Sequence, residues 1–249
     1  MLRSRSVSLI LLAFCGVASA DPIAIPNFSF ELPPVERNEE NPFGALPFID
    51  DWDETAIGLG DESDQNTGVF LNTDVGEPDH ITNAHLDRLA FVSSLIGNTV
   101  RQTLAETYEV GKRYTFTIAI GKSTAFPAGG TEQLEVALYY LNGGIDDIII
   151  SRFVSGSQVG TTTLLDVSVT LPYVNSSDPW VCEPIGVLVR PALSDPDDED
   201  GEGFWNVDHA RLEELVGIPA ASTWGLLVLS IMILTMGTLA LGRREAIAA

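Results

Sequence analysis

Apolar and polar residues alternate along the middle of the chain with a period of two. Residues 114–120 alternate large apolar side chains with threonine and alanine, and residues 134–140 and 165–171 repeat the pattern. Successive side chains of a β-strand point to opposite faces of its sheet, so such a segment buries one face and leaves the other in solvent. The three segments therefore predict half-buried β-strands.

Turn-forming residues separate these segments at short intervals. Asn142-Gly143-Gly144 is a strong hairpin signal that leads into a further run from Ile145, and Pro127-Ala128-Gly129-Gly130 precedes the strand at 134–140. Another strand is expected over residues 181–189. Because helical periodicity is scarce and turns recur often, the pattern predicts an all-β sandwich.

Residues 37–82 are less regular than the rest and are rich in Asp, Asn, Gly and Pro. We expect long loops here around short strands such as residues 69–71. Loops of this kind, held on a rigid sandwich, are common positions for binding sites.

The N-terminus has the pattern of a cleavable signal peptide over residues 1–20. Arg3 and Arg5 precede the apolar run 7–14, and Ala18-Ser19-Ala20 offers small residues for cleavage before Asp21. A lipoprotein interpretation would use Cys15 as the anchor. This interpretation is disfavoured, because lipoprotein processing requires a small residue before the cysteine and here that residue is the bulky Phe14.

The C-terminus has the pattern of a single membrane-spanning helix. Residues 224–241 are 18 uncharged, largely apolar residues, followed by Arg243 and Arg244. At about 1.5 Å per residue this segment crosses most of a bilayer's hydrocarbon core. Since positive residues favour the cytoplasmic side, the ectodomain at 21–217 is expected outside. A buried core helix is the alternative, but no polar stripe interrupts the run.

The segment that leads into this helix resembles a known sorting signal. Its matching residues are Ile218, Pro219, Ser222, Trp224 and Gly225, followed after the helix by Arg243 and Arg244. This resembles PEP-CTERM signals, most of all the Ile-Pro-Thr-Leu variant, although Ala220 and Ala221 replace Thr-Leu. The resemblance implies sorting over residues 218–249 by an exosortase-type enzyme. The protein would then stay anchored at the cell surface or be released into the extracellular matrix.

A second resemblance extends over most of the ectodomain. Residues 25–31 are similar to the Asn-x-Ser-Phe-Glu opening of galactose-binding-like jelly rolls, and Trp52 follows as their usual tryptophan. Residues 100–116 are similar to that family's central strands, and residues 207–212 to its closing strand. The resemblance implies a jelly-roll β-sandwich, a fold that includes several carbohydrate-binding modules.

The same resemblance implies a structural calcium ion held by Glu31 and Asp208. Calcium takes six to eight oxygen ligands, which two carboxylates and loop carbonyls can supply. The alternative makes Asp208 a turn or cap residue and Glu31 a solvated strand end. The acidic run 195–202 invites a second calcium site, but Pro196 stands at its first ligand position, so a solvated loop is favoured.

Charge and cysteine content narrow the function classes. The chain has 13 Lys and Arg against 35 Asp and Glu, a net charge of −22. Nucleic-acid binding is disfavoured, because a basic footprint for phosphates is missing. Once a signal peptide is removed, Cys182 is the single cysteine and has no partner for an intrachain disulfide. We expect it to be a buried small apolar residue, with a free thiol as the alternative.

No catalytic motif stands out in the sequence. His80, His85 and His209 are scattered, and neither a Gly-x-Ser-x-Gly elbow nor a His-x-x-x-His pair occurs. Asp79 with His80 and His85 could ligate a metal, but loop histidines on the surface are favoured. The sequence therefore predicts a protein that is not an enzyme.

The function expected from these features is an exported binding module for polysaccharide or matrix in the cell envelope. Exposed aromatic rings pack on apolar sugar faces, and Trp52, Tyr139 and Trp180 are the candidate side chains. The opposing interpretation places them in the core, since Tyr139 and its neighbour Tyr140 point to opposite sides of a strand. A structural matrix protein without a specific ligand is the alternative function, and a secreted hydrolase is less favoured.

Overall fold

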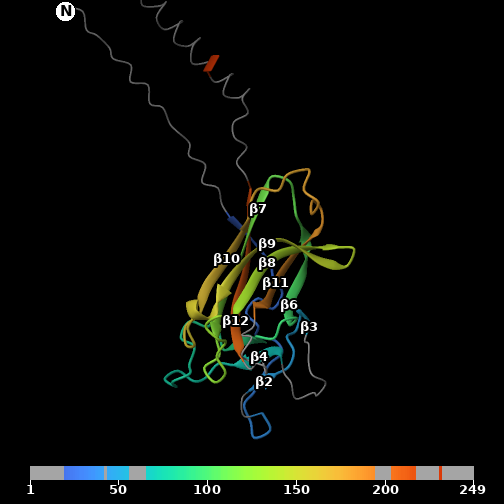
Figure 1. Cartoon of the computed structure of the whole chain (residues 1–249). Helices are drawn as coiled ribbons and strands as arrows, with labels where there is room; N and C mark the ends of the chain where they lie inside the picture. The colour runs from blue at the N-terminus through green and yellow to red at the C-terminus, as the bar shows by residue number, and fades with distance from the viewer. Residues whose placement is uncertain (1–19, 42–43, 56–65, 194–202, 217–229, 232–249) are drawn as a thin grey trace, which may run out of the picture. The chain divides into compact units, whose positions relative to one another are not determined.

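The computed structural model describes residues 20–41, 44–55, 66–193, 203–216 and 230–231 (Figure 1). Residues 19–216 make up one compact unit. Apart from Ala20 the predicted signal peptide lies outside the described residues, and so does the predicted sorting signal apart from residues 230 and 231. Among the residues that are described, no helix is both long and apolar enough to span a membrane.

Two antiparallel sheets form the domain, as Figure 1 shows. The seven-stranded sheet has the order β10 (Leu165–Leu171), β7 (Lys112–Lys122), β12 (Phe204–Val216), β5 (Arg88–Ser93), β4 (Thr67–Leu71) and β2 (Ala45–Leu46), with β1 (Ala20–Ile23) paired to β12. The five-stranded sheet has the order β3 (Asp53–Thr55), β6 (Thr99–Thr107), β11 (Pro184–Leu193), β8 (Gln133–Asn142) and β9 (Ile145–Ser155). A single 3₁₀ turn, Gly156–Gln158, follows β9.

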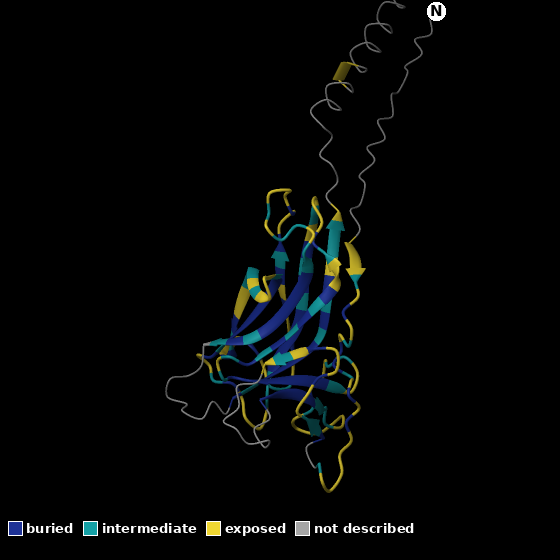
Figure 2. Ribbon diagram, turned by 90° about the vertical axis from the view of Figure 1, so that its right-hand side faces the viewer, coloured by how far each residue is buried: buried dark blue, intermediate teal, exposed yellow. Residues whose placement is uncertain are grey.

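The hydrophobic core lies between the two sheets, where the strands are dark blue in Figure 2. Phe116, Ile118 and Ile120 of β7 and Leu134 and Val136 of β8 are all buried in it. Each fully buried side chain of this size contributes roughly 1.5–3 kcal/mol to folding. The alternation in the sequence is thus the pattern of one sheet face packed on another, and the prediction of an all-β sandwich is confirmed.

The individual strand predictions hold with one shift in position. Residues 114–120, 134–140 and 165–171 lie in β7, β8 and β10, as predicted. The hairpin also forms, because Asn142 pairs with Ile145 across Gly143 and Gly144, whose φ angles of 62° and 89° favour glycine. The strand expected over 181–189 begins only at Pro184, since turns occupy the residues before it.

Cys182 is not the buried apolar residue that was expected. It is an exposed free thiol in the turn before β11, with a φ angle of 66°. Its backbone N–H donates to the carbonyl of Tyr108. The turn therefore holds the backbone against β6 while the side chain faces solvent.

The face of the seven-stranded sheet that points away from the core, here called the first outer face, also carries buried side chains. Trp205 and Val207 of β12 belong to the core, so Phe204, Asn206 and Asp208 point to the other side. A small cluster of Ile81, Leu89, Ala119 and Leu164 covers part of this face. The first outer face therefore combines buried polar groups with apolar and aromatic side chains.

Candidate functional site

Four phenylalanines form a continuous row on or beside the first outer face, here called the phenylalanine row. Phe70 of β4 and Phe91 of β5 have ring centroids 6.4 Å apart, and Phe91 lies 5.8 Å from Phe204 of β12. Phe126, in the loop between β7 and β8, extends the row at 6.4 Å from Phe204 and is 54% exposed. The Phe91–Phe204 and Phe126–Phe204 pairs are edge-to-face and the Phe70–Phe91 pair is tilted, and rings at these separations attract one another.

Two glycines keep the backbone of this face free of side chains. Gly68 of β4 pairs with Phe91, and a Cβ atom at Gly68 would lie 2.9 Å from the Phe91 ring. Gly121 of β7 pairs with Asn206, and a Cβ atom there would lie 2.7 Å from Leu164 Cδ2. Larger residues at either position would push these side chains off the sheet.

Asp208 is a buried carboxyl group on the first outer face. It is 0% exposed, and it pairs in register with Ala119 of the apolar cluster. Its Oδ2 accepts the backbone N–H of His85 at 2.5 Å, and its Oδ1 accepts that of His209 at 2.6 Å. Burial raises the pKa of Asp208 to about 7, although these two hydrogen bonds act to lower it.

No ion pair among the described residues includes Asp208. Arg211, three residues further along β12, pairs instead with Asp166 at 2.7 Å. Arg88 pairs with Glu31 at 2.9 Å. A carboxyl group with a pKa of about 7 is partly protonated at neutral pH, and the protonated form is the one that a proton donor requires.

The two histidines that bond Asp208 through their backbones also contact each other. The rings of His85 and His209 are stacked with centroids 4.4 Å apart, and Phe28 lies 5.4 Å and 5.9 Å from them. Burial, and then the charge of Arg211, lowers the pKa of His209. These histidines looked unrelated in the sequence, and the fold brings them together beside Asp208.

His80 stands apart from this pair. Its Nδ1 contacts the carbonyl oxygen of Thr73 at 2.6 Å, within the same loop. No group of three or more His, Cys, Asp or Glu side chains in the described part of the chain is placed to share a metal ion. The alternative in which Asp79, His80 and His85 share a metal therefore has no support there.

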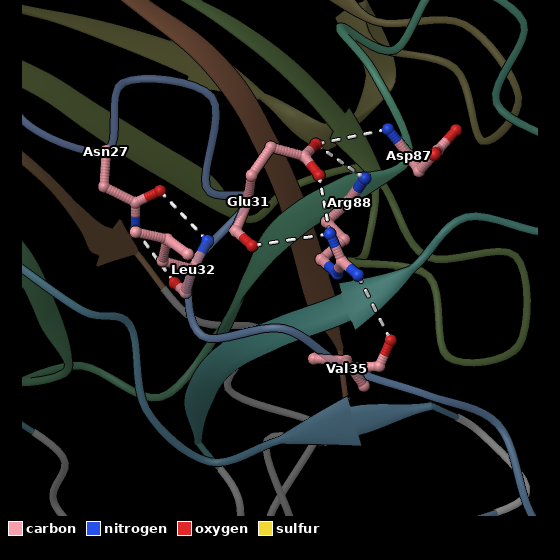
Figure 3. A network of polar contacts seen from close by, with 6 residues as sticks. All are labelled: Asn27, Glu31, Leu32, Val35, Asp87 and Arg88. Carbon is pink, nitrogen blue, oxygen red and sulfur yellow. Dashed lines mark hydrogen bonds and ion pairs between the residues drawn. The ribbon is translucent and has the colours of Figure 1, made fainter.

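The predicted calcium ligands, Glu31 and Asp208, are both occupied by N–H donors. Glu31 Oε1 accepts the backbone N–H groups of Asp87 and Arg88, and its Oε2 pairs with the Arg88 guanidinium, as Figure 3 shows. A guanidinium so close to the carboxylate would repel a calcium ion. The arrangement does not fit a calcium site on these two residues, and the bound ion stays a prediction.

The aromatic residues proposed to bind sugar do not form an exposed row. Trp52 is buried in the core against Phe30, with ring centroids 5.0 Å apart. Tyr139 is 0% exposed, and Trp180 is half-buried against the core beside Tyr140. The interpretation that placed these residues in packed positions is the better one.

Tyr139 lies instead on the outward side of the five-stranded sheet, here called the second outer face. Its hydroxyl is 2.8 Å from that of Thr103, and its ring packs directly on Gly186 of β11. Two ion pairs lie on the same face: Arg101 with Asp146, and Arg190 with Glu135 at 2.7 Å. Each of these two carboxylates has a cationic partner.

The sequence did contain one signal for the site that was missed. Phe204, Asn206 and Asp208 occupy alternate positions, and so do Leu89 and Phe91 of β5. Two strands whose two faces both carry large or polar residues indicate a sheet that is covered on both sides. The signal identifies two strands with a covered outer face, but not the neighbours that cover it.

A family model described as HpiC1-like, HpiC1 cyclase, matches residues 21–211. A solved apo form of a cyclase from Fischerella sp. shares 18% identity at a TM-score of 0.60, covering 80% of this chain and 98% of that one. A cyclase from Fischerella sp. TAU in complex with 4-(1H-indol-3-yl)butan-2-one shares 18% identity at a TM-score of 0.57, covering 80% and 99%. No curated protein matches.

Proposed function

Because the chain belongs to the HpiC1-like cyclase family, we propose that it is an enzyme that closes a ring in an apolar, aromatic small molecule at the first outer face. The prediction of a non-catalytic polysaccharide-binding or matrix protein was wrong, since a family of cyclases overturns it. The sequence shows no motif for this activity, because one buried aspartate near aromatic rings has no characteristic spacing along the chain.

Asp208 is the proposed proton donor of this reaction. A proton delivered to an alkene or carbonyl of the substrate creates a cationic carbon, which a nucleophilic carbon of the same molecule attacks. Loss of a proton from the new ring then restores a neutral product and returns a proton to the site. Substrate and product are isomers, so the step needs neither an oxidant nor a cosubstrate.

The phenylalanine row is suited to hold such a substrate. Aromatic faces bind apolar rings through dispersion, and their negative π faces stabilise a nearby cation by about 0.5–2 kcal/mol. Phe91 and Phe204 lie on the two strands that pair beside Asp208. The row therefore combines a surface for an aromatic substrate with stabilisation of its cationic intermediate.

The segment 82–87 covers Asp208 in the structure, because it carries the His85 N–H that the carboxylate accepts. Since Asp208 is completely buried, this segment moves aside when a substrate reaches the carboxyl group. Closure over the bound substrate then excludes water from a reactive cation. His85 lies on this segment and stacks on His209, whose backbone also bonds Asp208.

An indole is the substrate class that we propose. The support is the structurally similar Fischerella cyclase, which was solved with an indole ketone. An indole ring matches the apolar phenylalanine row, and its C3 carbon is a nucleophile suited to ring closure. An indole with an unsaturated side chain provides both partners of the reaction in one molecule.

Two measurements test this proposal. The purified protein should bind 4-(1H-indol-3-yl)butan-2-one in a calorimetric titration, and Phe91→Ala should weaken that binding about tenfold, the loss expected when one aromatic contact of about 1.4 kcal/mol is removed. Incubation with an indole that carries an alkene side chain should give a product of equal mass without the alkene proton signal. Absence of both binding and turnover across a panel of such indoles would refute the proposed substrate class.

The cellular location is a separate proposal. We propose that the sandwich, a jelly roll of the galactose-binding-like kind, is exported and anchored through residues 218–249. The apolar runs 7–14 and 224–241, with the basic residues beside them, support this proposal. Fractionation of cells that express the chain with and without residues 218–249 tests it. Equal distribution of both forms would contradict anchoring and sorting.

A further inference from the structure

Arg88 lies among oxygen atoms contributed by the segment before β2. Its Nη1 donates to Glu31 Oε2 at 2.9 Å and contacts the Glu31 carbonyl at 3.5 Å, and its Nη2 donates to the Val35 carbonyl at 3.4 Å (Figure 3). The backbone N–H of Arg88 donates to Glu31 Oε1 at 2.9 Å. One carboxylate and two carbonyls thus converge on one cationic side chain.

Asn27 shapes the turn that presents these oxygens. Its Nδ2 donates to the carbonyls of Leu32 and Asp50 at 2.8 and 2.9 Å, and its Oδ1 accepts the Leu32 N–H at 3.1 Å. The φ angles of Asn27 and Phe30 are 46° and 56°, in the left-handed region. This tight turn directs Glu31 toward the start of β5, and Figure 3 shows the Glu31 side chain pointing toward Arg88.

Carboxylate and carbonyl oxygens are the ligands that hard cations such as calcium prefer. In this protein the guanidinium occupies that oxygen set, and both Glu31 oxygens are used by N–H donors. Glu31 and Arg88 are each about four-fifths buried, at 20% and 21% side-chain exposure, so the pair is fixed within the fold. A second cation at Glu31 would have to displace this guanidinium.

We propose that Arg88 is a built-in cation that takes the place of the calcium ion which the jelly-roll resemblance places between Glu31 and Asp208. The N-terminal segment is therefore tied to β5 by a side chain of the protein itself, and folding does not depend on metal at this position. Asp208 is released from metal ligation and remains buried without a cationic partner. The inference does not rest on the proposed cyclase activity.

Thermal melting in calcium and in chelator tests this proposal. Wild-type protein should melt at the same temperature in both. Arg88→Ala should melt at least about 5 °C lower in chelator, because it leaves Glu31 buried and unpaired. Calcium should recover part of that loss in Arg88→Ala, since an ion that binds only the folded state raises the melting temperature.

Control variants separate the alternatives. Arg152→Ala removes an exposed arginine that contacts only the Ser168 carbonyl at 3.5 Å, and it should melt like the wild type. If Arg88→Ala does not fold, Arg88→Lys is the variant to measure. It keeps a positive charge beside Glu31 and should retain most of the wild-type stability. A calcium-dependent rise in the wild type that Glu31→Gln abolishes would overturn the proposal, and so would an Arg88→Ala variant that melts like the wild type. If calcium raises the melting temperature of Glu31→Gln as much as that of the wild type, the ion binds elsewhere and the proposal stands.

Discussion

The two outer faces of the sandwich differ in how their buried carboxyl groups are held. On the second outer face, Glu135 and Asp146 each form an ion pair with an arginine, around the buried ring of Tyr139. On the first outer face, Asp208 lies beside an apolar cluster, and its contacts are two backbone N–H groups. Both faces are built on antiparallel strands of the same domain.

This difference shows where proton chemistry can occur. A carboxylate beside a guanidinium stays ionised near neutral pH and acts as a structural tie. A carboxyl group held in apolar surroundings keeps its proton and can donate it. The number of acidic residues in this chain therefore says little about catalysis, and the burial of Asp208 among apolar neighbours is what supports its proposed role as a proton donor.

The largest expected effect separates the two faces by activity. Asp208→Asn should lower turnover of an accepted indole by about 10²–10⁴-fold, the usual contribution of a general acid. Asp146→Asn is the matched control on the second outer face and should keep its turnover. Product formation followed by chromatography and NMR measures both. Equal turnover in the two variants would remove Asp208 from the mechanism.

The next effect concerns stability as a function of pH. The pKa of Asp208 is raised from 3.8 to about 7, so between these values the folded protein holds a proton that the unfolded chain has lost. This group therefore makes the free energy of unfolding fall as pH rises from about 4 to 7, by at most on the order of 4 kcal/mol, with no further loss above pH 7.

Urea unfolding at several pH values measures this effect. Asp208→Asn should lack the decline, so that its stability relative to the wild type increases from pH 4 to pH 7. Asp146→Asn should not reproduce that increase. Parallel stability curves for Asp208→Asn and the wild type would show that the carboxyl group is not protonated in the folded state.

Glycine substitutions on the two faces give a smaller and contrasting pair of effects. A Cβ atom at Gly186 would lie 2.4 Å from the ring of the fully buried Tyr139, so Gly186→Ala should cost about 1–3 kcal/mol of stability. A Cβ atom at Gly121 would lie 2.7 Å from the flexible end of the Leu164 side chain and 3.3 Å from the Gly160 carbonyl oxygen, so Gly121→Ala should cost less. Turnover should fall more in Gly121→Ala than in Gly186→Ala, since Gly121 lies beside Asn206 on the first outer face. Chemical denaturation and turnover assays compare them.

The smallest effect is expected at the ion pair of Arg211 and Asp166. The Asp166 side chain is 59% exposed and that of Arg211 is 33% exposed, so Asp166→Asn should change the free energy of unfolding by less than about 1 kcal/mol. Added salt should reduce this difference further. A loss of several kcal/mol would mean that the fold depends on this pair more than its exposure indicates.

The sequence predicted the scaffold better than it predicted the site. Strands β7, β8 and β10 and the hairpin at Gly143 and Gly144 followed from alternation and turn chemistry, which depend on neighbours in the chain. Cys182 was placed wrongly, because a small apolar residue in a turn has no such pattern. The phenylalanine row was missed because its four members come from four separate segments.

The sequence by itself determined the two-sheet sandwich, because the period of two in side-chain direction is a local property of each strand. It also determined the acidic charge, which disfavours nucleic acid. Only the tertiary structure decided that His85 meets Asp208, 123 residues further along, and that Arg88 rather than Asp208 faces Glu31. The reason is physical: protonation state and ion pairing depend on burial and on neighbours that are distant in the chain, and only the folded chain brings those together.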